Sequence, residues 1–166
     1  MKTLYFYPMQ YHIMKPKTFL VPLLLCCLHV QAQQPKLAKP EYKTAIGIKF
    51  FPAAASIKTF SGKKAAWEFL GYFNDGFRLT ILSEYHGKLN SDGHLKWYIG
   101  GGGHAGFSNK ASGGSAKIGI DGVIGLDYKF LHLPLNLSLD WQPSFGFGDE
   151  SSFTGDWGGI AVRYCF

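Results

Sequence analysis

The sequence has few charges, little cysteine and no long hydrophobic run. Only 17% of the 166 residues are charged, and no apolar stretch reaches the ~20 residues that a membrane-spanning helix needs. The nearest candidate runs from Phe19 to Val30, which is about the length of the apolar region in a secretion signal. Cys26 and Cys27 lie within it, so only Cys165 would remain after cleavage and no intramolecular disulfide is expected.

The first 32 residues have the pattern of a Sec signal peptide. Lys15 and Lys17 precede the apolar run, and Val30-Gln31-Ala32 forms a small-residue cleavage site. Met14 is a possible true start. Removal of residues 1–32 takes away three of the 17 basic residues and no acidic residue. The remaining chain has 14 basic and 11 acidic residues, a net charge of +3. This modest charge predicts no nucleic-acid partner.

A period of two dominates the rest of the chain and is clearest from Lys117 to Phe130. Even positions are apolar or aromatic, except for Gly122, whereas odd positions are mostly charged or small. Such alternation is typical of a β-strand with one apolar face. It continues for fourteen residues, longer than an ordinary strand of a soluble sheet. We therefore expect the apolar face to contact lipid and the polar face to line the inside of a closed barrel.

Seven further segments alternate in the same way. The eight expected strands are Thr44–Phe51, Ala55–Ser61, Ala65–Phe73, Phe77–Leu89, Leu95–Phe107, Lys117–Phe130, Pro134–Phe147 and Trp157–Phe166. The predicted fold is all-β, an eight-stranded antiparallel up-and-down transmembrane β-barrel over residues 45–166, after a periplasmic lead-in over residues 33–44. An even strand number places both termini on the periplasmic side.

Several local features are predicted within these strands. Phe51 shares the inward parity of Lys49, and Pro143 is expected near a bulge because proline disrupts a strand ladder. Gly148 to Asp156 is expected to be a polar loop. The four glycines Gly100 to Gly103 indicate a bend or a close approach of backbones, since no Lys-Ser/Thr follows to complete a phosphate-binding loop.

Charges and aromatics divide between the two faces. The charged residues expected on the inner face are Lys49, Lys58, Glu68, Arg78, Glu84, Asp121, Asp127, Asp140 and Arg163. Outward aromatics gather toward the two strand ends, as in the interfacial girdles of membrane barrels. An eight-stranded barrel is only wide enough for its own side chains. We therefore expect a packed interior of paired charges.

The signal peptide, the outward-apolar strands and the terminal Phe166 resemble those of small eight-stranded outer-membrane barrels of the OmpA/OmpX type. The stretches WYIGGGGHAGF, GIDGVIGLDYKF, PLNLSLDWQP and the closing VRYCF also resemble a family of small uncharacterised outer-membrane barrels. The resemblance to the OmpA/OmpX type implies that Tyr164 and Phe166 belong to a C-terminal signal read by the barrel-assembly machinery. Adhesins of this type have long protruding strands, whereas the outer connections here are short, which argues against an adhesive role.

Candidate catalytic and metal-binding residues are few. His104 and Ser108 are four apart on one strand, about 13 Å at the usual rise, which is too far for direct contact. His86 and His104 fall at opposite ends of neighbouring strands, and no third metal ligand accompanies them. We expect no catalytic residue, no cofactor and no metal.

The expected function is that of a monomeric outer-membrane barrel of a Gram-negative bacterium, with a structural or interaction role and no open pore. Outer-membrane lipid would surround it. Three alternatives remain: a lipid-A-modifying enzyme, a soluble lipocalin-like carrier with an apolar interior, and a small pore.

Overall fold

The computed structural model describes residues 42–73, 76–108, 116–147 and 152–166. The predicted signal peptide and nearly all of the predicted lead-in lie outside these ranges, as does most of the loop expected after Ser108. Within the described residues, no helix combines the length and the hydropathy needed to cross a membrane.

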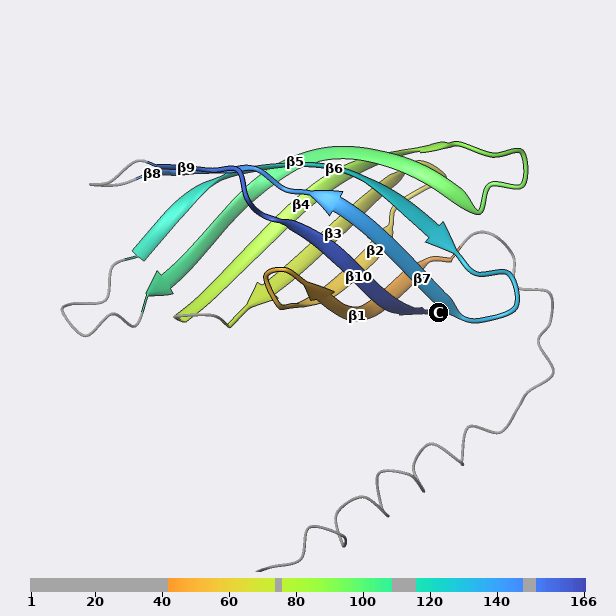
Figure 1. Cartoon of the computed structure of the whole chain (residues 1–166), viewed down its shortest axis with the longest axis horizontal. Coiled ribbons are helices and arrows are strands. Elements are labelled where there is room, and N and C mark those ends of the chain that lie inside the picture. The colour runs from red at the N-terminus through yellow and green to blue at the C-terminus, as the bar shows by residue number, and fades with distance from the viewer. Residues whose placement is uncertain (1–41, 74–75, 109–115, 148–151) are drawn as a thin grey trace, which may run out of the picture. The chain divides into compact units, whose positions relative to one another are not determined.

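Ten strands make up the described chain (Figure 1). They are β1 (Thr44–Phe50), β2 (Ala54–Phe60), β3 (Ala65–Tyr72), β4 (Gly76–Lys88), β5 (Leu95–Ser108), β6 (Ala116–Lys129), β7 (Leu135–Trp141), β8 (Ser144–Phe147), β9 (Ser152–Thr154) and β10 (Gly158–Cys165). β7 with β8, and β9 with β10, each form one interrupted strand, so the wall has eight strands.

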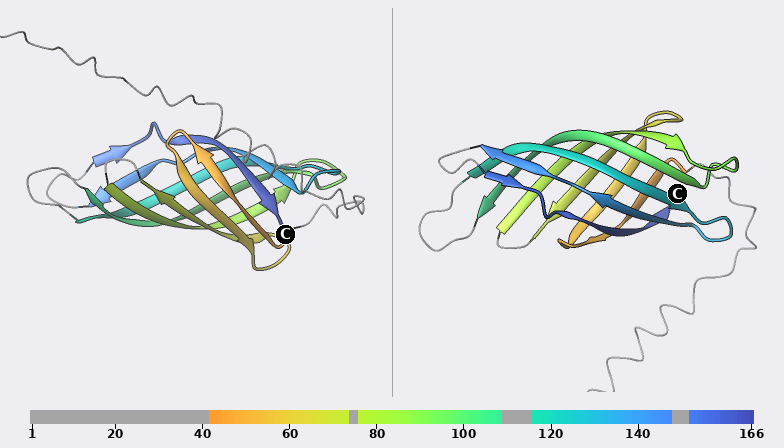
Figure 2. Two further views of the ribbon diagram at one scale, coloured as in Figure 1. Left: turned by 90° about the horizontal axis from the view of Figure 1, so that it is seen from below. Right: turned by 45° about the horizontal axis from the view of Figure 1, so that its top comes forward.

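The sheet closes on itself as an antiparallel barrel. Each of the eight wall strands pairs with its neighbours in sequence, and β1 pairs with β10 over a register that runs from Ala45–Cys165 to Phe50–Ile160. The strands cross the barrel obliquely (Figure 2), as closure requires. The predicted eight-stranded antiparallel barrel is confirmed.

Two rims bound the barrel. The terminal rim holds the end of β10 and the turns at residues 61–64, 89–94 and 130–134. The distal rim holds the turn at residues 51–53 and the opposite strand ends. β5 and β6 have fourteen residues each, whereas β1 and β2 have seven. The long strands extend farther toward the distal end (Figure 1).

Pro143 interrupts the seventh wall strand. β7 ends at Trp141 and β8 begins at Ser144. The Pro143 carbonyl accepts a hydrogen bond from Gly122 N at 2.8 Å, but proline has no N–H to donate in return. On the β6 side the register continues across the break without an extra residue.

The bulge lies in the strand that faces Pro143. Trp141 pairs with Gly158, and Ser144 pairs with Thr154. Three residues of the β9–β10 strand therefore face two residues of the β7–β8 strand, which is the geometry of a β-bulge. The prediction of a bulge near Pro143 is confirmed, although the extra residue belongs to the neighbouring strand.

Two sequence-based expectations are wrong. Phe51 does not point inward: β1 ends at Phe50, and Phe51 lies in the turn with a φ of 66° and is 75% exposed. The polar loop expected from Gly148 to Asp156 contains strand β9. Its sequence, Ser-Phe-Thr, is too short for alternation to be detected, and pairing with β8 forms the strand.

Glycines allow the strands to approach closely where the wall curves. A Cβ on Gly102 would lie 1.8 Å from the Ile81 carbonyl oxygen, and one on Gly100 would lie 2.3 Å from the Ser83 oxygen. Both positions have inward parity. The predicted close approach of backbones within the run Gly100 to Gly103 is confirmed.

Candidate functional site

The barrel interior is the most distinctive site because it buries many ionisable side chains. All nine charged residues that the sequence assigned to the inner face take part in an ion pair. They form three groups along the barrel. We call these the deep cluster (Ser56, Lys58, Glu68, Glu84, Asp127 and Arg163), the middle group (Lys49, Asp140 and Gln142) and the distal cluster (Arg78, His104 and Asp121).

Arg163 organises the deep cluster from β10. Its side chain is fully buried and pairs through NH2 with the Glu68 carboxylate of β3. Nε donates to Ser56 Oγ at 2.6 Å, and Ser56 in turn donates to Glu68 Oε1 at 2.8 Å. NH1 donates to Asn136 at 3.1 Å and to Ser138 at 2.8 Å. The guanidinium fork thus ties β2, β3, β7 and β10 together.

Lys58 supplies the second buried cation. Its Nζ lies 2.8 Å from Glu84 Oε2, 3.3 Å from Glu68 Oε2 and 3.9 Å from Asp127 Oδ2. The ammonium also lies 4.1 Å from the centroid of the Tyr98 ring. Three carboxylates and an aromatic face around one ammonium replace the water that burial removes.

Tyr42, which precedes the predicted barrel in the sequence, also contacts the deep cluster. Its hydroxyl donates to Asp127 Oδ2 at 3.3 Å, and Asn136 donates to Asp127 Oδ1 at 2.8 Å. Burial, followed by the nearby Asp127 carboxylate, raises the pKa of Tyr42 well above its usual value, so the phenol remains a donor. Alternation could not predict this contact, because Tyr42 falls in the lead-in, before the alternation begins.

The middle group joins the two clusters. Lys49 Nζ lies 2.6 Å from Asp140 Oδ1 and donates to Gln142 Oε1 at 2.8 Å. Tyr98 donates to Asp140 Oδ2 at 2.8 Å. Gln142 then donates from Nε2 to Asp121 Oδ1 at 3.3 Å. Hydrogen bonds and ion pairs therefore connect the middle of the barrel with its distal part.

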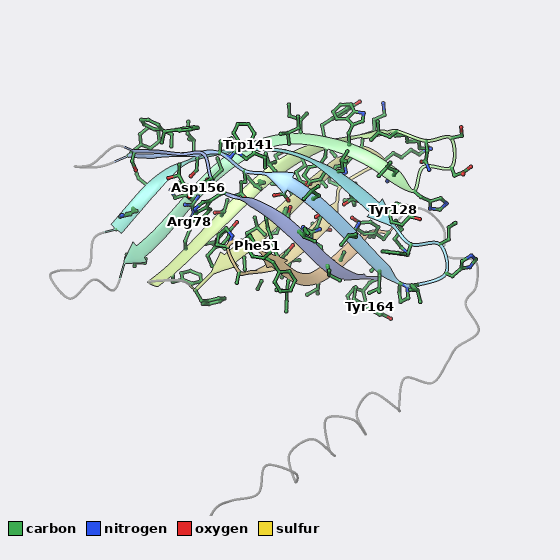
Figure 3. The ribbon with its side chains drawn as sticks, viewed as in Figure 1. Phe51, Arg78, Tyr128, Trp141, Asp156 and Tyr164 are labelled. Carbon is green, nitrogen blue, oxygen red and sulfur yellow. The ribbon has the colours of Figure 1, made fainter. Side chains whose placement is uncertain are left out.

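The distal cluster is centred on Asp121 of β6. Its Oδ1 lies 2.5 Å from Arg78 NH2, and its Oδ2 lies 2.6 Å from His104 Nδ1. The same Nδ1 also lies 3.0 Å from Arg78 Nη2, so the imidazole is held between the guanidinium and the carboxylate. Arg78 also lies over the Trp157 ring, with Cζ 4.1 Å from the centroid, and its position inside the wall is visible in Figure 3.

Some members of the interior were harder to predict than the charges. Gln142 has inward parity and could have been recognised as a bridge. Trp157 shares the parity of Arg163 in the expected strand Trp157–Phe166 and could likewise have been assigned inward. The contact between His104 and Asp121 could not be predicted from two residues that lie seventeen positions apart.

Among the described residues, no three His, Cys, Asp or Glu side chains are grouped so as to hold a metal ion.

The outer face carries the aromatic residues of both rims. Near the terminal rim the rings pair as Tyr85–Trp97, Tyr128–Phe130 and Tyr164–Phe166, with centroids 5.0–6.1 Å apart. Toward the distal rim the pairs are Phe73–Phe77 and Phe145–Phe147, both at 5.5 Å. Trp141 lies between the two groups and donates from Nε1 to the Gly155 carbonyl at 2.7 Å; Figure 3 labels it with Tyr128 and Tyr164.

Comparison with known proteins gives no relative. No protein-family model matches the chain, and neither a curated protein nor a solved structure is significantly similar to it. The geometry of the two faces of the wall is therefore the basis on which a function can be inferred.

Proposed function

We propose that the chain is an integral β-barrel protein of the outer membrane of a Gram-negative bacterium, exported through the Sec pathway. It has a structural or interaction role, a packed polar interior and no open pore, and it acts as a monomer. The observation that carries this proposal is an outer face of large apolar side chains around an interior of buried charges.

Strand β6 displays this contrast most clearly. Ile118, Ile120 and Ile124 are 50–58% exposed, whereas Asp121 and Asp127 are at most 5% exposed. A monomeric soluble protein rarely exposes a large contiguous apolar surface. A lipocalin-like carrier needs the opposite arrangement, with apolar residues around an internal ligand. The observed faces therefore favour hydrocarbon outside the wall.

The aromatic residues support the same proposal. Tyr and Trp prefer the boundary between hydrocarbon and water because their rings are apolar and their N–H or O–H groups are polar. The outward Trp67, Tyr85, Trp97, Tyr128 and Tyr164 all lie toward the terminal rim. We assign this rim to the periplasmic interface. Exposed Tyr164 and Phe166 would then form the signal for the barrel-assembly machinery.

The packed interior supports a barrel without an open pore. Arg163, Lys58 and Glu68 have no solvent-accessible side-chain surface, and their carboxylate and cationic groups reach across the lumen from different strands. A chain of paired charges occupies the space that ions would need to cross.

The experiment that tests the membrane assignment is fractionation of the expressed full chain. We expect extraction only with detergent and a change in gel migration on heating, as the folded barrel unfolds. A monodisperse protein in buffer without amphiphile would contradict the proposal. In planar bilayers we expect no unitary conductance, and regular current steps would contradict the absence of a pore.

A lipid-A-modifying enzyme is the second candidate, and the His104–Asp121 contact of 2.6 Å favours it. An imidazole oriented by a carboxylate can serve as a general base. The side chain of Ser108, the nucleophile considered from sequence, lies outside the described residues. We assign the pair a structural role because Arg78 neutralises Asp121. Mass spectrometry of lipid A with the wild type and with His104→Ala tests this: a product lost in the variant would establish the enzyme.

A further inference from the structure

A cavity of about 400 Å³ opens at the terminal rim, beside β4 and the turn at residues 61–64. It lies far from the distal cluster and plays no part in the interior ion pairs described above. Its lining residues are Lys63, Lys64, His86, Gly87, Lys88 and Lys96. Four lysines and no carboxylate therefore surround one enclosed space.

The charge of this cavity is not compensated within the described part of the chain. None of its four lysines forms an ion pair there. Lys96 is only 6% exposed, and its Nζ faces the Phe60 ring at 5.1 Å from the centroid. Among the described residues this ammonium meets an aromatic face but no carboxylate, and an aromatic face gives less stabilisation than a paired carboxylate would.

A buried polar atom on the cavity wall also lacks a partner. His86 uses Nε2 to contact Glu84 Oε2 at 2.9 Å. Its Nδ1 is buried without a hydrogen-bond partner among the described residues. The Phe60 and Tyr98 rings hold the imidazole in place, with centroids 4.8 Å and 5.0 Å away. With Nε2 donating to Glu84, Nδ1 is an acceptor, so a ligand that carries a hydroxyl group beside its anion would complete both the imidazole and the lysines.

The depth of the cavity indicates the source of that anion. Lys64 Nζ donates to the Tyr85 hydroxyl at 3.0 Å, and Tyr85 lies beside Trp97 on the outer face. These are the aromatics assigned above to the interface, where the phosphates of lipid headgroups lie. The cavity therefore opens at the level of headgroups and close to the lipid-facing wall.

We propose that this cavity binds the phosphate of an anionic lipid headgroup from the periplasmic leaflet. The inference rests on the proposed membrane function. Lys63 and Lys88, which are exposed, would attract the headgroup, and buried Lys96 would pair with its phosphate.

The test uses the full chain folded in an uncharged detergent and native mass spectrometry. Short-chain phosphatidylglycerol is titrated against short-chain phosphatidylcholine and against inorganic phosphate. The test variant is Lys63→Ala/Lys88→Ala. The matched control, Lys43→Ala/Lys117→Ala, removes the same charge from exposed lysines outside the cavity.

We expect phosphatidylglycerol to bind in preference to phosphatidylcholine. The test variant should weaken the binding of phosphatidylglycerol about tenfold or more, because each lysine near a headgroup contributes roughly a factor of several to the affinity. The control variant should weaken the same binding less than about twofold.

Equal loss in both variants, or no preference over phosphatidylcholine, would overturn the site. Equal affinity for inorganic phosphate would overturn the lipid as its source. A chain that binds phosphate through these lysines but needs no detergent would instead overturn the membrane assignment and leave the site intact.

Discussion

The deep and distal clusters contain the same kinds of charge in different surroundings. Lys58, Glu68 and Arg163 have no exposed side-chain surface, whereas Arg78 retains 19% exposure and lies over Trp157. The Arg78 guanidinium can still be hydrated in part, although the Asp121 side chain that it pairs with is fully buried. Each deep charge depends wholly on its partners. The comparison indicates that the deep cluster specifies how the barrel closes, while the distal cluster is more tolerant of change.

The physical basis of this difference is desolvation. Removing one member of a buried pair leaves the other charge without water or a partner, at a cost of about 3–5 kcal/mol. A partly exposed pair is screened by solvent and contributes far less. Four substitutions test this contrast.

The largest effect is expected for Arg163→Met. The change leaves Glu68 buried without its guanidinium and removes donors to Ser56, Asn136 and Ser138. We expect a loss of about 3–5 kcal/mol in the free energy of unfolding, measured by urea titration of the barrel in lipid vesicles. The double variant Arg163→Met/Glu68→Met should recover part of the loss. A single variant within 1 kcal/mol of wild type, on the order of a surface pair, would contradict the role of the deep cluster.

Gln142→Leu should have the next largest effect, because it removes the bridge between the middle group and the distal cluster. Lys49 and Tyr72 lose an acceptor, and a buried donor or acceptor left unpaired costs about 1–3 kcal/mol. Unfolding in the same vesicles measures the change. Gln142→Met keeps the length of the side chain but neither hydrogen-bonding group, and should lose as much as Gln142→Leu. A clearly smaller loss with methionine would show that packing, and not the bridge, matters.

Asp121→Asn should cost about 1–2 kcal/mol, since the amide oxygen can still accept from one partner and Arg78 is partly hydrated. The same unfolding measurement applies. High salt should reduce the difference from wild type, because it screens the exposed guanidinium. A loss as large as that of Arg163→Met would erase the distinction between the clusters.

The smallest effect is expected for Trp157→Leu, which removes the ring over Arg78. A partly exposed cation–π contact contributes about 0.5–1 kcal/mol. Trp157→Phe, which retains an aromatic face, should lose less. If leucine and phenylalanine destabilise the barrel equally in urea, the guanidinium does not depend on the ring.

The sequence predicted the wall of the barrel well because alternation has only two outcomes at each residue. Lys58 and Glu68 were both assigned inward from parity, and both are buried. Prediction failed where the period breaks: Phe51 lies in a turn, and β9 is too short to alternate. The partners within the interior, such as His104 with Asp121, depend on register between strands, which parity does not specify.

The unequal strand lengths have a consequence for any bilayer around the barrel. At about 3.3 Å per residue and a tilt near 40°, the fourteen residues of β5 rise about 35 Å, but the seven of β1 rise under about 20 Å. The apolar band of an outer-membrane barrel is about 25 Å tall. A flat sheet of lipid therefore cannot match both sides of the molecule. The acyl chains beside β1 to β3 must compress, or the whole cylinder must lean, so that hydrophobic mismatch falls on one flank only.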